Sequence, residues 1–400
     1  MSYEPRISTL AAALLAAFGT TIQIPVQAAM IIVTDTGDSG SASTCTLRQA
    51  IVSMNAGAVA GTGCTYSGPA FGSSDTIAFS TTAFPNGSPN NTITLASGPL
   101  SITAANLAIE AAPNGSITID AHKASSVMVD SVSGGSLSLD HMSLTNGATT
   151  GPGGGISGFA ASLTLTHSTL SGNAASLGGG IYARYVTLTN CTLSGNSANN
   201  GGGIWIRGGN VTGSTLSGNS ASGTGGGIYT VGALTLTNST VSGNSAQSTG
   251  LGAVGGGGIL VQFPGSLTLT SVTISANYAI TYGAGIFGNG PVVITANNSI
   301  VAGNTNPGTN TGQNVYPGIT TGLDDLIGSN PKLGPLANNG GPTQTMLPLP
   351  GSPAIDNGSD ATCAASPVNG VDQRGVPRPQ GARCDIGAVE TDTIFANGFE

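Results

Sequence analysis

The stretch STLSGN at Ser214–Asn219 decides the fold of this 400-residue chain, because close variants of it recur along the middle of the sequence. The variants end at asparagines spaced 23, 23, 25, 33 and 27 residues apart: Asn173, Asn196, Asn219, Asn244, Asn277 and Asn304. A run of glycines followed by isoleucine recurs in step with them, at Ile156, Ile181, Ile204, Ile228, Ile259 and Ile286. Two landmarks in each unit of about 25 residues identify an internal repeat, and repeats of this length are typical of solenoids.

Apolar residues within each unit follow the period of two that is typical of strands with one buried face. One column alternates with threonine and serine and stands three residues before the asparagines, at Leu170, Leu193, Leu216, Val241, Ile274 and Val301. Short strands between glycine and asparagine turns predict coils of a parallel β-helix, each burying its inward side chains against its neighbours. We expect the asparagines to stack as a ladder of side-chain amides at a turn, where asparagine also tolerates the left-handed conformation.

The composition supports an all-β rod of this kind and excludes several other classes. Glycine fills 64 positions, hydrophobic residues make up 39% of the chain, and only 9 Lys and Arg and 17 Asp and Glu are present. Glycine without a period of three excludes collagen, and the scarcity of Glu and Lys excludes a charged coiled coil. A net charge of −8 argues against nucleic acid as a partner, because both would be negatively charged.

The N-terminal residues have the order of a secretory signal, with the basic Arg6, the apolar run Leu10–Phe18 and a small-x-small sequence ending at Ala28. We therefore expect the mature chain to begin near residue 29 and to contain no transmembrane span. An oxidising compartment favours disulfides between cysteines that are close in sequence. The predicted pairs are Cys45–Cys64 and Cys363–Cys384, which leaves Cys191 free and buried in a column of small residues.

Motifs at the two ends of the chain carry a resemblance to known proteins. CTLRQAI at Cys45–Ile51 resembles the CSLREAI box that opens right-handed parallel β-helix proteins of the polymorphic outer-membrane-protein type, with Thr46 and Gln49 as departures. SPAIDNG at Ser352–Gly358 and DQRGVPRPQGARCDIGAVE at Asp372–Glu390 resemble the choice-of-anchor Q module. The final IFANGFE resembles a tail found on secreted proteins of Gram-negative bacteria. The resemblance implies a protein that is secreted or held at the outer-membrane surface of such a bacterium.

Repeats and resemblance together predict five segments: a leader at 1–28, an N-terminal cap at 29–90, β-helix coils at 91–330, a C-terminal module at 331–391 and a tail at 392–400. The two disulfides are expected to staple the ends of the rod. In the C-terminal module, the resemblance implies local ion pairs between Arg374, Arg378 and Arg383 and the carboxylates of Asp372, Asp385 and Glu390.

Carboxylates are missing from the middle of the rod, where no Asp or Glu occurs between His141 and Leu323. A glycoside hydrolase of the usual kind needs two carboxyl groups, and a calcium-assisted lyase needs several. We therefore expect a non-catalytic protein with no cofactor and no metal site. A polysaccharide lyase or glycoside hydrolase on the same scaffold remains the alternative, because polar residues gather in the early coils: Asp120, His122, Lys123, Asp130, Asp140 and His141. His167 stands alone in a Thr-rich strand and is expected to be a surface residue.

Large side chains follow the glycine–isoleucine landmark, and alternation turns them outward if the isoleucines point inward. Aromatic rings with flanking arginines suit sugar stacking and contact with acidic groups, although aromatic ladders also simply cover exposed sheets. We predict an adhesin-like protein that contacts a polysaccharide or a cell-surface glycan, with Trp205 offering the largest ring face. The ligand-binding residues of this hypothesis are Tyr182, Arg184, Trp205, Arg207, Tyr229 and Phe287.

Overall fold

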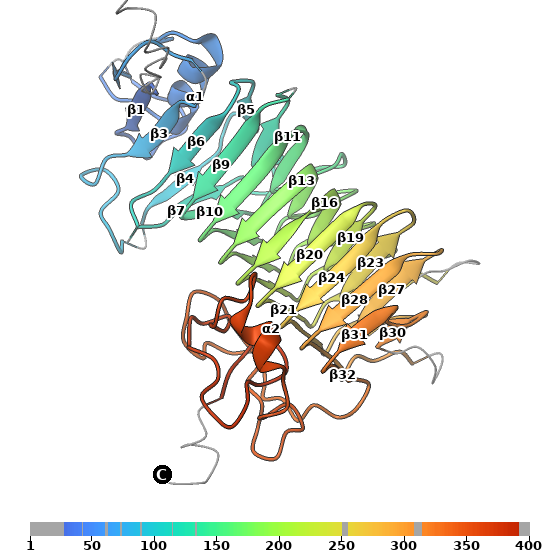
Figure 1. Cartoon of the computed structure of the whole chain (residues 1–400). Helices are drawn as coiled ribbons and strands as arrows, with labels where there is room; N and C mark the ends of the chain where they lie inside the picture. Colours follow the sequence, from blue (N-terminus) through green and yellow to red (C-terminus); the bar gives the residue numbers. More distant parts are fainter. Residues whose placement is uncertain are drawn as a thin grey trace, which may run out of the picture.

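The computed structural model describes residues 28–391 apart from 42, 61–62, 73, 89, 114, 133, 250–254 and 308–313. The described strands wind into a rod of stacked coils, with the N-terminal segment at one end (Figure 1). Residues 1–27 of the expected leader and the expected tail at 392–400 lie outside the described residues. Neither described helix is long and apolar enough to cross a membrane.

The N-terminal segment places one helix against the first coil. Helix α1 (Leu47–Ala56) begins at a capping box, in which the Thr46 hydroxyl accepts the Gln49 N–H and the Gln49 side chain accepts the Thr46 N–H. A capping box accepts Thr in place of Ser and Gln in place of Glu, so the two departures in this motif keep the helix start intact. The predicted disulfide between Cys45 and Cys64 is confirmed beside this helix.

Three sheets form the walls of the rod, and the strands pair in parallel except for β2, which pairs antiparallel to β1. Sheet A contains β1 (Met30–Val33), β2 (Tyr66–Ser67), β3 (Thr76–Phe79), β5 (Leu100–Ile102), β6 (Leu107–Glu110), β8 (Met128–Asp130), β9 (Ser136–Asp140), β11 (Ile156–Thr166), β13 (Ile181–Thr189), β16 (Ile204–Thr212), β19 (Ile228–Thr230), β20 (Ala233–Thr237), β23 (Ile259–Gln262), β24 (Ser266–Thr270), β27 (Ile286–Asn289), β28 (Val293–Asn297), β30 (Val315–Tyr316) and β31 (Thr321–Leu323). Because β3 already pairs with β6, the sheet begins inside the segment expected as the cap.

Sheet B runs along the other side of the core, and sheet C adds a third wall to four of the coils. Sheet B contains β4 (Thr92–Thr94), β7 (Ile117–Asp120), β10 (Met142–Thr145), β12 (Thr169–Ser171), β14 (Thr192–Ser194), β17 (Thr215–Ser217), β21 (Thr240–Ser242), β25 (Thr273–Ser275), β29 (Ile300–Val301) and β32 (Leu326–Ile327). Sheet C contains β15 (Ser197–Ala198), β18 (Ser220–Ala221), β22 (Ser245–Ala246) and β26 (Tyr278–Ala279).

The predicted inward column is confirmed along sheet B. Its six members are in register from strand to strand, and all are fully buried: Leu170, Leu193, Leu216, Val241, Ile274 and Val301. Each coil covers the apolar side chains of the previous one, so the core runs as a continuous column along the rod. Since one coil could not bury these side chains alone, stability arises from stacking.

The predicted asparagine ladder is confirmed, and each rung ties two coils together. The side-chain oxygen of Asn196 accepts both the backbone N–H and the side-chain N–H of Asn173, at 3.0 Å each, and the Asn173 amide also donates to the Leu144 carbonyl. The left-handed conformation predicted for these asparagines is wrong, because the preceding residue adopts it instead. Gly172 and Gly195 have φ of 65° and 62°, so glycine makes the turn and leaves asparagine free to build the ladder.

The C-terminal module folds back along sheet B. Gln373 is its anchor, because the side-chain amide donates to the hydroxyls of Thr215 and Thr343 and accepts from the hydroxyl of Thr240. Helix α2 (Asp360–Ala364) carries the confirmed disulfide between Cys363 and Cys384. The module is the loop-rich segment drawn in red and orange beside β21 and β32 in Figure 1.

Candidate functional site: the outward face of sheet A

The outward column of sheet A begins where alternation predicted it. Tyr182, Trp205 and Tyr229 are register partners on β13, β16 and β19, and each is partly exposed. The Tyr182 and Trp205 ring centroids lie 5.0 Å apart with 30° between the planes, and those of Trp205 and Tyr229 lie 5.8 Å apart with 11° between the planes. The three rings therefore form an offset stack along the rod, a favoured arrangement for aromatic pairs.

Stacking changes what this column offers to a ligand. Because Trp205 lies between Tyr182 and Tyr229, the expectation that Trp205 presents an open ring face is wrong, and the stack turns ring edges toward solvent. The expectation that Phe287 is exposed is also wrong. Phe287 is only 5% exposed, and Tyr316, its register partner on β30, stacks against it with ring centroids 5.5 Å apart. Phe287 therefore belongs to the cover of the sheet and not to a ligand site.

Tyr185 is the aromatic residue that sequence reasoning missed. Simple alternation from Ile181 points Tyr185 inward, but Arg184 and Tyr185 both face outward because the alternation breaks between them. Tyr185 is 51% exposed, and the Arg184 guanidinium carbon lies 5.6 Å from its ring centroid, within the range of a cation–π contact. The signal was present in the sequence, since Ile181 and Val186 both point inward although five residues separate them.

A groove lies beside Tyr185 on the outward face of sheet A. Two glycines of the following coils, Gly209 and Gly232, line it together with Tyr185. The groove has a volume of about 380 Å³, and its walls include Tyr185, Arg207, Asn210 and Thr235. An aromatic ring, a guanidinium, an amide and a hydroxyl are the groups that fix sugars by stacking and hydrogen bonding.

Two arginines stand side by side on this face. Arg184 and Arg207 lie between the same register pairs, Ala183 with Ile206 and Tyr185 with Gly208, and both are exposed. No Asp or Glu occurs in the sequence between Asp140 and Asp324, so the coils around them supply positive charge without carboxylates. Like charges on neighbouring strands destabilise a sheet by roughly 0.2–1 kcal/mol, which an anion between them would offset.

The polar residues of the early coils do not form one site. Asp120 ends β7 in sheet B and accepts a hydrogen bond from the Asn146 amide, whereas Asp130 ends β8 in sheet A and is 4% exposed. Burial raises the pKa of Asp130, which accepts a hydrogen bond from the Val132 N–H. His122 and Lys123 follow β7 in a turn with φ of 51° and 60°. The sequence cluster is therefore split between the two walls.

Asp140 and His141 do meet a third group, His167. His167 is exposed, as predicted, but it does not stand alone, because its ring stacks on that of His141 with centroids 4.6 Å apart. Its Nδ1 atom also lies 3.4 Å from Asp140 Oδ1. His141 and His167 hold the same turn position in successive coils, a relation that becomes visible only when the coils are aligned on β9 and β11.

Cys191 is free and fully buried, as predicted. Burial raises the pKa of its thiol to about 12, so the thiolate needed for nucleophilic chemistry does not form near neutral pH. Its backbone N–H donates to the Ser214 hydroxyl, which keeps the small-residue column in register. Cys191 is a packing residue.

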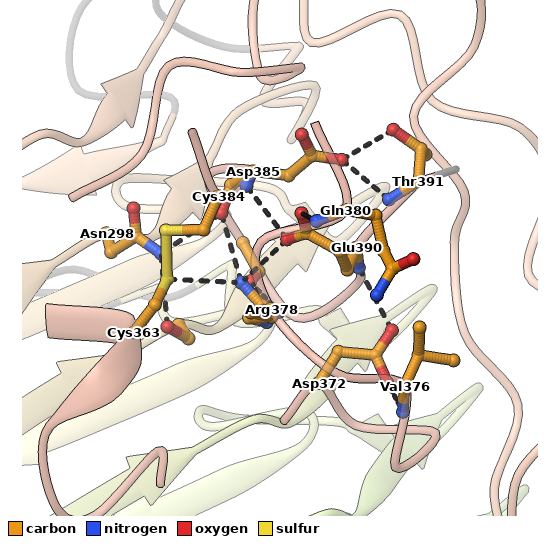
Figure 2. Close-up of polar contacts among 12 residues, drawn as sticks. Asn298, Cys363, Asp372, Val376, Arg378, Gln380, Cys384, Asp385, Glu390 and Thr391 are labelled. Carbon is orange, nitrogen blue, oxygen red and sulfur yellow. Dashed lines mark hydrogen bonds and ion pairs between the residues drawn. A yellow bond between two sulfur atoms is a disulfide. The ribbon is translucent and has the colours of Figure 1, made fainter. Parts of the chain in front are cut away.

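The arginines of the C-terminal module serve its structure (Figure 2). Arg378, shown in Figure 2, pairs with Glu390 at 3.9 Å. Arg374 pairs with Asp372 at 2.8 Å, so two of the three expected cations have their ion pair. Arg383 is exposed, and no ion pair joins it to another described residue. Burial lowers the pKa of Arg378 and raises the pKa of Glu390, because neither charge is hydrated. The fully buried Arg378 also donates to the Asp385 and Gly387 carbonyls, which locks the segment that lies on sheet B.

A second cavity, of about 520 Å³, lies within the C-terminal module. Its walls are mainly apolar, with Leu347, Leu349 and Ile355 among them, and Arg374 and Glu390 supply charged groups. Both charged side chains are engaged inside the module, where Arg374 donates to the Asp372 carboxylate and Glu390 accepts from the Gln380 N–H. The cavity therefore offers a polar ligand fewer open partners than the groove on sheet A.

The register of the coils, the inward columns and the asparagine ladder define a right-handed parallel β-helix repeat protein. A family model described as a right-handed β-helix region matches residues 154–317, which are the coils with the most regular repeats. No curated protein and no solved structure matches the chain.

Proposed function

We propose that the protein is a non-catalytic, adhesin-like rod that binds acidic polysaccharides across β13 and β16. Arg184, Arg207 and Tyr185 would make the main contacts, with Tyr182 and Trp205 beside them. The observation that carries the proposal is the pair of neighbouring arginines next to an exposed aromatic ring, in a stretch of sequence without carboxylates. A uronate or a sulfated sugar would bring a negative charge to the two guanidinium groups.

Several small contributions to the free energy of binding add up at the outward face of β13 and β16. A guanidinium binds a carboxylate or sulfate through two parallel hydrogen bonds, which gives direction as well as attraction. Stacking on the Tyr185 ring adds roughly 1 kcal/mol, by analogy with aromatic pairs. Together these contacts support affinities between millimolar and micromolar for a short oligosaccharide. A long chain that crosses several coils gains from repeated contacts, and salt weakens the ionic part.

The proposal includes a location outside the cytoplasm. The N-terminal box at Cys45–Ile51 and the module at 331–391 are proposed to be the CSLREA-type cap and the choice-of-anchor Q module of a polymorphic outer-membrane-protein-type β-helix. Two disulfides favour an oxidising compartment. The rod would then present its sheet A face to polysaccharides at the surface of a Gram-negative cell or in the medium around it.

The test is a binding series on the purified mature chain. Polygalacturonate oligomers serve as the acidic ligand and neutral dextran oligomers as the comparison. Arg207→Gln and Tyr185→Ala are each expected to weaken binding roughly three- to tenfold, since a tenfold change corresponds to about 1.4 kcal/mol. Tyr278→Ala is the matched control, because Tyr278 is 36% exposed on β26 of sheet C, away from the groove.

Two outcomes would contradict the proposal. Equal affinity for the acidic and the neutral oligomers would remove the role of the arginine pair. Release of unsaturated or reducing ends that is abolished by Asp120→Ala or Asp140→Ala would instead support the alternative, a polysaccharide lyase or glycoside hydrolase working in the early coils.

A further inference from the structure

Three side chains converge at one turn of the rod, between sheets A and B. Asp140 ends β9, His141 follows it, and His167 comes one residue after β11 ends. Both histidines have left-handed backbone, with φ of 55° and 46°, so the same turn repeats in consecutive coils. Asp140 Oδ1 lies 2.9 Å from His141 Nδ1 and 3.4 Å from His167 Nδ1.

We propose that Asp140, His141 and His167 form a binding site for a divalent late transition-metal cation, with Zn²⁺ as the reference ion. Two imidazole nitrogens and one carboxylate oxygen are a ligand set that suits zinc, cobalt, nickel and copper. Calcium and magnesium prefer oxygen ligands throughout, so the two nitrogens disfavour them.

The distances agree with this assignment. Zinc bonds to nitrogen and oxygen of about 2.0–2.1 Å place neighbouring ligand atoms about 2.9–3.4 Å apart, between octahedral and tetrahedral angles. The two observed separations from Asp140 Oδ1, 2.9 and 3.4 Å, span this range. All three donor atoms lie within 4.8 Å of one another, so small side-chain rotations bring the two imidazoles onto a shared ion.

The Nδ1 atom of His141 lacks the partner that a buried nitrogen needs, which supports a metal ion at this position. This atom is buried and has no hydrogen bond of acceptable geometry, although the Asp140 carboxylate is close. A buried polar nitrogen without a partner is unfavourable, because it has lost its hydration. A cation shared with Asp140 would satisfy this nitrogen along its lone pair.

The next coil supplies a group that can orient His167. Asn190 holds the same turn position, with φ of 53°, and its amide nitrogen lies 3.2 Å from His167 Nε2. A metal on Nδ1 moves the ring proton to Nε2. Rotation of the Asn190 amide then presents its oxygen to accept that proton, and such outer partners fix the ring of a ligating histidine.

The metal site is separate from the glycan site. On β11 the register partner of Tyr185 is Ser162, five residues before His167, which follows the end of the same strand. The glycan groove therefore lies at the middle of the sheet A strands and the metal site beyond their ends, and failure of one proposal leaves the other standing.

The test is a titration of the full, untagged chain with ZnCl₂ after removal of metals by a chelator. Isothermal calorimetry is expected to show one ion per chain with micromolar affinity. His167→Asn and Asp140→Asn should each weaken binding at least tenfold, and Asn190 shows that asparagine fits the turn in the neighbouring coil. His122→Asn is the matched control, because His122 is an exposed histidine in another left-handed turn, with φ of 51°.

A second measurement uses the parent chain alone. Diethyl pyrocarbonate labels accessible histidines, and mass spectrometry locates the label. Zn²⁺ should protect His167, which is 40% exposed in its side chain, while His122 stays reactive. The proposal is overturned if no saturable binding is seen below about 1 mM, if affinity is unchanged in His167→Asn and Asp140→Asn, or if Zn²⁺ leaves His167 labelling unaltered.

Discussion

Sheets A and B are built from the same repeats, and they bury the same kind of inward column, but their outward faces differ. On sheet B the outward residues of β17, β21 and β25 are Thr215, Thr240 and Thr273, and each is at most 2% exposed beneath the C-terminal module. On sheet A the outward residues near β13 and β16 include Tyr185, Arg184 and Arg207, which remain exposed. The comparison separates a face used for internal docking from a face available to a ligand.

Residue choice follows this division of roles. Threonine hydroxyls on sheet B have fixed partners within the chain, such as the Gln344 carbonyl, which accepts from Thr215 at 2.6 Å. Further along, Ile300 takes the place of threonine and packs against Ala354 and Ile386 of the module. Neighbouring arginines on sheet A are costly as simple cover, because their two positive charges repel each other. The same scaffold thus carries two chemistries on opposite walls of the coil.

The largest expected effect tests how the module is held on sheet B. Arg378→Ala leaves Glu390 buried without its cation and removes the bonds to the Asp385 and Gly387 carbonyls. Loss of one partner from a buried pair costs about 3–5 kcal/mol. Amide exchange should show early opening of the module and of β21, while β13 stays protected. The matched Arg383→Ala should change little, and equal loss of protection in β13 would show that the two walls are not independent.

The next effect concerns the ladder that both walls share. Asn219 accepts from Asn196 and donates to the Leu193 carbonyl and to Asn244. Asn219→Ala therefore leaves hydrogen-bonding groups in three coils without their partner. The free energy of unfolding should fall by about 3 kcal/mol, taking roughly 1–3 kcal/mol for each buried group left unpaired. The control is Asn210→Ala, on the exposed face of β16. Comparable unfolding curves for the two variants would rule out the ladder as a main source of stability.

A smaller effect sharpens the contrast between docking and binding. Gln373→Ala removes the hydrogen bonds to Thr215, Thr240 and Thr343. The expected loss of stability is about 1–3 kcal/mol, because the buried Thr240 hydroxyl loses its acceptor, whereas Thr215 and Thr343 still donate to the Gln344 and Gly213 carbonyls. Gln344→Ala is the control, since the Gln344 side chain is exposed and the hydrogen bond from Thr215 goes to its backbone carbonyl, which alanine keeps. Polygalacturonate affinity should be equal in both variants, and a loss in Gln373→Ala would mean that the ligand needs the module.

The smallest effect is a pH dependence at the last coil. Burial raises the pKa of Asp325 to about 6, from its ordinary value of 3.8. The folded state then binds a proton more tightly than the unfolded state, so the free energy of unfolding falls as pH rises from about 4 to about 6. Asp325→Asn can still accept the Ser299 N–H. This variant should reduce the difference in the free energy of unfolding between low and neutral pH by about 1 kcal/mol, after allowance for solvent screening. Chemical unfolding at pH 4 and pH 7 provides the measurement, and an unchanged slope would contradict it.

Features that repeat in the sequence were predictable from it. The inward column ending at Val301 and the asparagine ladder occupy the same positions in every repeat unit. Their constant spacing in the sequence was therefore enough to predict both. Both disulfides join cysteines 19 and 21 residues apart, which local pairing anticipated. Stacking turns a one-dimensional period directly into contacts, because equal positions in successive units become neighbours.

Features that break the repeat were harder to predict. Tyr185 faces outward only because the strand alternation slips beside it, and Phe287 is covered because Tyr316 stacks on it from a less regular coil. The meeting of His167 with Asp140 depends on which turns align, at a separation of 27 residues. Docking of the module on sheet B is a non-repetitive contact over 158 residues, from Gln373 to Thr215. The buried Ile300, at a threonine position, was the local sign that something covers that wall.

The most direct test of the central claim uses Trp205, the single tryptophan of the chain. It lies in the aromatic stack on the proposed face, so its emission reports on sheet A and not on the module. Titration with polygalacturonate oligomers should change that emission in a saturable way, with an affinity that falls as salt is raised, while dextran oligomers leave it unchanged. Binding that calorimetry detects without any change in Trp205 emission would place the ligand elsewhere and contradict the account.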